Sequence, residues 1–347
     1  MSLNTTWFLL IAVLWVGYFI LEGFDFGVGM LLKTVAKTQA ERRTLITALG
    51  PVWDGNEVWL LVAGGATFAA FPEWYATLFS GFYLPLFLIL VSLIVRGVSF
   101  EYRSKHGDTK WRNRWDNAIV VASFVPSLLW GVAFANIARG VPLERSSQGF
   151  IEYTGGFFNL LNPFALVGGL VTLTLFATHG AFFIALKTDG VVRERANKLA
   201  GKLGLATALL AVVFLGWLNL SYSDKTSVVI LSAVIVVAWL SALEANRRGR
   251  EGWAFLFSAV TSAMVVVTLF AALYPYVMPS SISPEFSLDI FNASSTHYTL
   301  KVMTYVAVVL TPLVLIYQGW TYWVFRKRIS PSQIKNAESG VLDQINN

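Results

Sequence analysis

The chain has 347 residues, of which 56% are hydrophobic and only 13% are charged, and its mean hydropathy is +0.61. A soluble domain carries about 25% charged residues, so the composition excludes an ordinary soluble fold and indicates a protein that crosses a membrane several times. The absence of cysteine excludes disulfides, thiolate metal ligands, iron–sulfur clusters and cysteine nucleophiles. We expect no nucleic-acid partner, because Lys and Arg in cytoplasmic loops of a membrane protein account for the net charge of +6.

Nine apolar segments have the length of about 20 residues that a helix needs to cross ~30 Å of hydrocarbon. In chain order they are 7–32, 50–71, 77–99, 116–138, 163–186, 203–221, 226–244, 253–275 and 300–325. We therefore predict an all-α polytopic membrane protein with nine transmembrane helices in a single domain, residues 1–329, followed by a polar tail over 330–347. The first segment is too long for the apolar part of a signal peptide, so we expect it to remain as a helix.

Lys and Arg gather in alternate connections, which are the loops after the first, third, fifth and seventh segments and the C-terminal tail. The exceptions on the other side are Arg139, Arg145, Lys225 and Lys301. Because cytoplasmic loops carry the excess of positive charge, the N-terminus is predicted outside and the C-terminus in the cytoplasm.

The segments divide into two four-helix units, residues 1–139 and 163–275, and a ninth helix over 300–325. The units share their loop-charge pattern, and the fourth helix of each opens near a tryptophan, Trp115 or Trp253. An even number of crossings in each unit would make the two copies parallel rather than inverted. A true duplication and a similarity caused by hydropathy alone both remain open.

Four acids interrupt the first two apolar segments, Glu22 and Asp25 in one and Asp54 and Glu57 in the other. A spacing of three puts both acids of a pair on one face of a helix. At 1.5 Å per residue from Lys33, Glu22 lies ~16 Å and Asp25 ~12 Å from the cytoplasmic edge, and the other pair enters from the same side. Ionisable groups at membrane depth usually face a protein interior or a wet cavity, so the four acids predict a path for protons or ions.

A structural role is the alternative for each of these groups. Asp54 and Glu57 could cap the second helix and favour its dipole. Glu22 could pair with Arg96, which otherwise would snorkel to the membrane surface or contact a lipid or quinone head group. His179 is the only histidine in a predicted span, where a hydrogen-bonded core residue, a proton relay and a single axial haem ligand are the alternatives.

The other two histidines, His106 and His297, lie in loops on opposite sides of the membrane. We therefore expect no metal site and no haem bound wholly by this chain. Small residues let helices approach closely, so helix packing is the favoured interpretation of Gly23 and Gly27, with ligand contact as the alternative.

The stretches around the acids resemble subunit II of the cytochrome bd-type quinol oxidase. The resembling segments are, in order, 23–30, 53–59, 64–66, 79–83, 102–105, 161–164, 275–281 and 299–304. Eight matches in register, from the first predicted helix to the ninth, make the signal specific. The chain departs from the family at Glu22, where members often carry Asp, and at Glu57, where another member carries Gln.

The resemblance implies a haem-free subunit of an enzyme complex in the bacterial cytoplasmic membrane that oxidises quinol, reduces dioxygen to water and contributes to proton-motive force. Subunit I would be the partner, holding two b-type haems and one d-type haem, and this chain would carry no catalytic residue of its own. A quinone bound to this chain, membrane lipid and small accessory subunits are further candidate ligands and partners.

On this interpretation Asp25 and Asp54 form the principal proton relay, Glu22 and Glu57 assist it, and Trp53 shapes its cytoplasmic start. Arg96 and His179, considered above, are candidate supporting residues. The alternative function is a proton-coupled secondary transporter, which also uses buried acids and glycine-rich helices. Against it, the sequence has no pair of Gly- or Pro-broken helices at corresponding positions of inverted halves.

Overall fold

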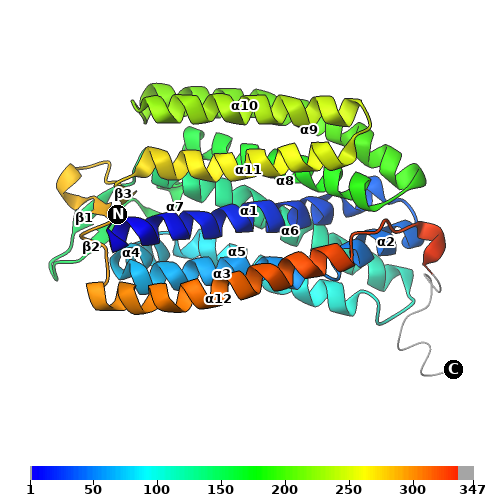
Figure 1. Cartoon of the computed structure of the whole chain (residues 1–347), viewed down its shortest axis with the longest axis horizontal. Coiled ribbons are helices and arrows are strands. Elements are labelled where there is room, and N and C mark those ends of the chain that lie inside the picture. The colour runs from blue at the N-terminus through cyan, green and yellow to red at the C-terminus, as the bar shows by residue number, and fades with distance from the viewer. Residues whose placement is uncertain (1, 335–347) are drawn as a thin grey trace.

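The computed structural model of the chain describes residues 2–334, so most of the predicted polar tail, residues 335–347, lies outside the described residues. Long helices run side by side along the length of the molecule (Figure 1). Within residues 2–334, the helices of 18 residues or more are α1 (Leu3–Val35), α3 (Trp53–Ala70), α5 (Tyr83–Tyr102), α6 (Thr109–Arg139), α8 (Pro163–Lys187), α9 (Gly190–Ser221), α10 (Thr226–Arg247), α11 (Glu251–Leu273) and α12 (His297–Val324).

Shorter elements lie at the ends of these helices. The short helices are α2 (Gln39–Leu49), α4 (Pro72–Gly81) and α7 (Gly156–Asn159), with 3₁₀ turns η1 (Pro284–Phe286) and η2 (Pro331–Gln333). Strands β1 (Leu143–Arg145) and β2 (Ile151–Tyr153) pair antiparallel, as do β3 (Tyr276–Met278) and β4 (Leu288–Asp289). Val141 joins the two strand-containing loops, because its N–H donates to the Pro279 carbonyl and its own carbonyl accepts from Ser281. One end of the bundle is therefore covered by ordered loops.

Eight of the long helices are apolar and long enough to cross a membrane, namely all of them except α3. The first turns of α3 hold Asp54, Asn56 and Glu57, which lower its hydropathy. The prediction of an all-helical membrane protein is confirmed. The count of nine spans, the orientation and the division into two four-helix units stay predictions.

Two short helices that the sequence analysis did not predict adjoin α3. Helix α2 occupies the loop after the first span and begins with a capping box, in which Thr38 and Glu41 satisfy each other's backbone N–H groups. Helix α4 follows α3 after Phe71, because Pro72 disfavours helical geometry at the residue before it and is itself well suited to the first turn. The predicted span 77–99 is therefore divided at Phe82 into α4 and α5.

Helices α6 and α9 begin earlier than the predicted spans at 116 and 203, since each continues past its apolar part into a charged turn. Asp108 caps α6 by accepting from the N–H groups of Lys110 and Trp111. Hydropathy marks only the apolar part of such a helix, so the polar extension has no signal in a search for spans.

Helix α1 lies inside the bundle and packs against α3, α6, α8 and α11. It crosses α8 at Gly27 and Gly180, where backbones touch: a Cβ at Gly27 would lie 2.0 Å from the Phe176 carbonyl oxygen. Helices α6 and α8 approach in the same way at Gly131 and Gly168. Close approach of glycine-bearing helices is a packing device of membrane proteins, and here it fixes the depth at which α1 presents its acids.

Candidate functional site

Helix α1 carries Glu22 and Asp25 within the bundle, and both side chains are fully buried. Residues on all sides of α1 are buried at this level, because α3, α6, α8 and α11 surround it. Two carboxyl groups thus lie in an apolar interior at membrane depth. An ionised carboxylate is stable there only with a charged or hydrogen-bonding partner.

The partner of Glu22 is Arg96 of α5, whose guanidinium is also fully buried and forms a close ion pair with it. The same guanidinium lies 3.5 Å from Oε2 of Glu57, a side chain that is 20% exposed. It also lies over the Phe26 ring, 4.6 Å from the ring centroid, which adds a cation–π contact. One cation therefore serves two carboxyl groups, on α1 and α3.

Asp25 is not part of that ion pair and is held by Asn56 of α3. The Asn56 amide nitrogen donates to Oδ2 of Asp25 over 2.7 Å, in a fully buried contact. The other oxygen of Asp25, Oδ1, is buried and has no hydrogen-bond partner among the described residues. One oxygen of this carboxyl group is therefore held by a hydrogen bond, and the other is available for a further hydrogen bond.

Asn56 links Asp25 to α12. Its side-chain oxygen accepts from the Tyr322 hydroxyl over 2.7 Å and from Gln318 Nε2 over 3.2 Å. Gln318 in turn accepts from the indole N–H of Trp59 over 2.9 Å. Because both ends of the Asn56 amide are bonded, its orientation is fixed, and α12 is tied to the buried cluster by polar contacts.

Asp54 lies in the first turn of α3, on its exposed side, and makes no hydrogen bond or ion pair with the described residues. The cap position of α3 is Val52, and no side chain caps the helix, so neither Asp54 nor Glu57 has the capping role. Asp54 is one turn from Glu57. Trp53 beside it is half-buried and packs on Phe100, with ring centroids 5.2 Å apart. Exposure thus decreases from Asp54, which is exposed, to Glu57, which is partly exposed, and then to Glu22 and Asp25, which are fully buried.

His179 is buried on α8 and is separate from the acids. Its Nδ1 lies 2.7 Å from the Ser258 hydroxyl and its Nε2 3.1 Å from the Ile20 carbonyl oxygen. Because a carbonyl can only accept, Nε2 carries the proton. The ring stacks on Phe255 with centroids 4.7 Å apart. Both ring nitrogens are engaged within the chain, which is the arrangement of a hydrogen-bonded core histidine.

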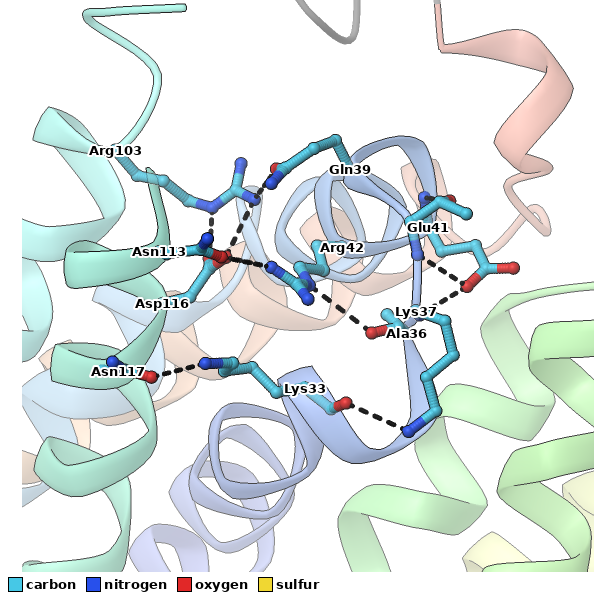
Figure 2. A network of polar contacts seen from close by, with 11 residues as sticks. Lys33, Ala36, Lys37, Gln39, Glu41, Arg42, Arg103, Asn113, Asp116 and Asn117 are labelled. Carbon is cyan, nitrogen blue, oxygen red and sulfur yellow. Dashed lines mark hydrogen bonds and ion pairs between the residues drawn. The ribbon is translucent and has the colours of Figure 1, made fainter. Parts of the chain in front are cut away.

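A polar network lies at the end of the bundle where α1 ends and α2 begins (Figure 2). Buried Asp116 of α6 accepts from Arg103 over 2.5 Å and from Arg42 of α2 over 3.0 Å. Nearby, Lys33 donates to Asn117 over 2.6 Å. Lys33 is eight residues after Asp25, or about 12 Å along the helix. The network therefore fixes α2 against α5 and α6 close to the buried acids.

Glu41 of α2 lies at the edge of this network (Figure 2). Partial burial alone would raise the pKa of Glu41, but hydrogen bonds from the N–H groups of Lys37 and Thr38 and an ion pair with Arg195 at 2.9 Å lower that pKa below its ordinary value. The carboxylate thus joins α2 to α9.

Sequence reasoning missed three polar residues of the site, Asn56, Gln318 and Tyr322. The sequence did indicate each of them, because a polar side chain inside an apolar membrane span needs a hydrogen-bond partner. Gln318 and Tyr322 are four residues apart and so share one face of α12. Their partner lies 262 or more positions away in the sequence, and spacing within a helix cannot reveal such a contact.

The acids and His179 are not arranged as a metal or haem site in the part of the chain that the structure describes. No group of three or more His, Asp or Glu side chains within residues 2–334 is placed to hold a metal ion. An axial haem ligand needs a free ring nitrogen, and His179 has none. His106 packs its ring on Trp111 in a loop, and His297 begins α12.

A separate apolar cavity of about 460 Å³ lies between α3, α4, α5 and α6. Its lining includes Gly64, Gly65, Trp74, Tyr75 and Trp130. Gly64 and Gly65 face open space rather than a neighbouring helix. The indole N–H of Trp74 is buried and has no acceptor among the described residues, although it borders the cavity.

Comparison with known proteins agrees with this architecture. The sequence profile of the family "Cytochrome bd terminal oxidase subunit II" matches residues 3–325. Cytochrome bd-I ubiquinol oxidase subunit 2 of Escherichia coli (strain K12) is 39% identical, with 96% of this chain and 97% of that protein covered. Cytochrome bd ubiquinol oxidase subunit 2 of Bacillus subtilis (strain 168) is 40% identical, with 95% and 97% covered.

Among solved structures, the bd oxidase from Geobacillus thermodenitrificans includes a chain that matches with a TM-score of 0.77 and 19% identity. The match covers 94% of this chain and all of that chain, and at this identity it supports the shared fold. The full-length sequence matches, the apolar spans and the common fold together place this integral membrane protein in the cytochrome bd terminal oxidase subunit II family.

Proposed function

We propose that this chain is the haem-free subunit of a quinol-oxidising terminal oxidase in the bacterial cytoplasmic membrane and that it conducts cytoplasmic protons toward the oxygen-reducing site of a partner subunit. Asp25 and Asp54 are the principal relay, with Glu22 and Glu57 as auxiliary groups and Trp53 at the start. Quinol oxidation and the reduction of oxygen belong to the haem-bearing partner, and this chain supplies protons and supports the assembly.

The charge balance of the buried cluster carries this proposal. Glu22 and Glu57 share a single cation, Arg96, and Asp25 is buried on α1 only three residues after Glu22. One guanidinium neutralises one carboxylate, so a neutral cluster needs protons on the other two carboxyl groups. Unpaired charges are costly at this depth, which favours the neutral state. Protons that neutralise buried carboxyl groups are exchangeable, whereas a purely structural ion pair needs none.

The order of exposure gives the proposed route its direction. Asp54 is exposed at the start of α3, Glu57 is one turn further and partly exposed, and Glu22 and Asp25 are fully buried. Buried polar atoms without protein partners are commonly bonded to water, so the available oxygen of Asp25 is a place for a bound water to continue the path. Asn56 cannot carry a proton itself, and its role is to position Asp25.

The proposed partner subunit packs on the side of α12. Leu300 is the only residue of this apolar helix that is fully buried in the isolated chain. Large apolar side chains, among them Leu313, Ile316 and Trp320, are exposed along it. Only 6% of its apolar span is buried within the chain, against 28% or more for the other candidate spans, so α12 has the fewest contacts with its own chain and the most surface to offer a partner helix. Since α12 also bears Gln318 and Tyr322, a partner seated there would lie next to the acid cluster.

The apolar cavity fits a quinone. Its lining is aromatic and aliphatic, and the free indole N–H of Trp74 offers a hydrogen bond to a quinone carbonyl. A quinone bound there would add a redox-active group to the complex. We expect a Trp74→Phe substitution to lower the amount of quinone that is extracted from the purified complex. An unchanged quinone content would argue against this position.

The experiment is oxygen consumption by the assembled complex carrying Asp25→Asn or Asp54→Asn, with haem content measured in parallel. We expect full haem content and a rate lower by on the order of 100-fold for Asp25→Asn, which is what one positioned proton-transfer group contributes. Glu285→Gln is the control, since Glu285 is an exposed acid of the predicted outer loop. Wild-type rates in both Asn variants would exclude the relay, although family membership would stand.

A further inference from the structure

We propose that the groove between the C-terminal end of α10 and the N-terminal end of α11 binds one anionic phospholipid of the adjacent membrane leaflet. The groove has a volume of about 650 Å³ and is open to the molecular surface. Its lining is Val237, Leu240, Ser241, Glu244, Ala245 and Arg248 on the α10 side and Arg250, Trp253 and Phe257 on the α11 side. The proposed proton relay does not involve this part of the molecule.

The groove is apolar at one end and cationic at the other. Val237 and Arg248 are eleven residues apart, which is ~16 Å along a helix. The lining changes over that length from Val237, Leu240 and Phe257 to Arg248 and Arg250. A phospholipid has the same polarity, because its acyl chains are apolar and its head group is charged.

Arg250 is the cation that is free to bind the head group. Arg248 is 64% exposed and pairs with Glu244 over 2.6 Å, and Arg247 beside the groove pairs with the same carboxylate over 2.9 Å. The side chain of Arg250 is exposed and makes no hydrogen bond or ion pair with any described residue. With three arginines against one glutamate, the cationic end of the groove keeps a net positive charge. Basic pockets between helices at this level attract anionic head groups.

Trp253 marks the depth of the membrane surface in the groove. Its indole is 54% exposed and stacks on Phe257, with ring centroids 5.8 Å apart. Tryptophan is enriched at the level of the head groups, where its ring contacts acyl chains and its N–H stays near polar atoms. The guanidinium of Arg250 and the ring of Trp253 thus lie one turn apart at the start of α11.

The position of α10 favours lipid over a protein partner as the occupant. Helix α10 packs on α9 and α11 and forms one edge of the bundle (Figure 1). The face that we assign to the partner subunit is α12, which lies at the opposite edge of the same view. In the membrane, the exposed side of α10 therefore faces lipid.

The test uses a Ser241→Cys variant in the assembled complex. The chain has no other cysteine, so maleimide labels this subunit only inside the groove. We expect dioleoyl phosphatidylglycerol in mixed micelles to slow the labelling at lower concentration than dioleoyl phosphatidylcholine does. Adding Arg250→Gln raises the phosphatidylglycerol concentration needed for half-protection about fivefold, the effect of one basic residue near a lipid surface. Arg114→Gln, which removes an exposed arginine of α6, leaves that concentration unchanged.

Three results would overturn the proposal. Equal protection by the two lipids would show that the head-group charge is not recognised. Unchanged protection in the Arg250→Gln background would show that this arginine does not hold the lipid. Protection by inorganic phosphate alone would show that the cationic end of the groove binds a free anion instead of a lipid head group.

Discussion

The ion pair between Arg96 and Glu22 allows the charge balance of the cluster to be tested by substitution and rescue. Both side chains are fully buried, so Arg96→Gln leaves an uncompensated carboxylate in an apolar interior. Removing one partner of a buried pair costs about 3–5 kcal/mol. A loss of that size is a large part of the 5–15 kcal/mol that stabilises a typical domain. We expect a lower midpoint of thermal unfolding for the complex and a lower yield of haem-containing material.

Glu22→Gln in the Arg96→Gln background should restore most of the stability, because it removes the orphaned charge. Glu57→Gln in that background should restore less. Glu57 is 3.5 Å from the guanidinium and partly exposed, and pairs of this kind are worth at most about 1 kcal/mol. If Arg96→Gln unfolds at the wild-type temperature, or if Glu22→Gln gives no rescue, the buried charge balance described here is incorrect.

Three further predictions concern other contacts of the site and its surroundings. Tyr322→Phe removes only the hydrogen bond to Asn56 and should cost about 0.6–1.7 kcal/mol in thermal unfolding of the complex; no loss would mean that α12 is held by other contacts. Gly27→Ala should prevent assembly of the haem-containing complex, because the added Cβ would lie 2.0 Å from a backbone oxygen of α8, whereas Gly216→Ala, with open space around it, should assemble normally. Glu41 has a lowered pKa in the folded chain, so its stabilisation is complete above the unfolded pKa near 4.5 and is lost as the pH falls through the folded value; thermal unfolding of Glu41→Gln should therefore depend less on pH below 4.5, and an equal dependence would contradict this role.

Much of the helical framework could be predicted from the sequence, because a run of about 20 apolar residues has few stable arrangements other than a membrane helix. Helix α2 could not, since its eleven residues are largely polar and only the Thr38–Glu41 capping box marks it. The pairing of Glu22 with Arg96 was one of two alternatives, and the choice depended on the rotation of α1 and α5 about their axes. Hydropathy does not determine that rotation.

The contacts of Asn56 could not be predicted from the sequence for a different reason. The motif around Trp53 indicated a role for its two acids and none for Asn56. The side chain of Asn56 is hydrogen-bonded to Asp25 of α1 and Tyr322 of α12, which lie near opposite ends of the chain. Only the packing of α1, α3 and α12 brings these groups together. The resemblance to a known family was therefore sufficient to predict the class of protein, whereas the partner of each buried acid required the structure.

Proton uptake by reconstituted complex tests the central claim most directly. The complex is placed in vesicles that hold a pH indicator on the cytoplasmic side of the protein, and uptake is followed together with oxygen consumption. We predict that Asp25→Asn slows both together and that Asp25→Glu, which keeps an ionisable carboxyl group, restores both. Unchanged proton uptake from that side in Asp25→Asn, with full haem content, would contradict the account.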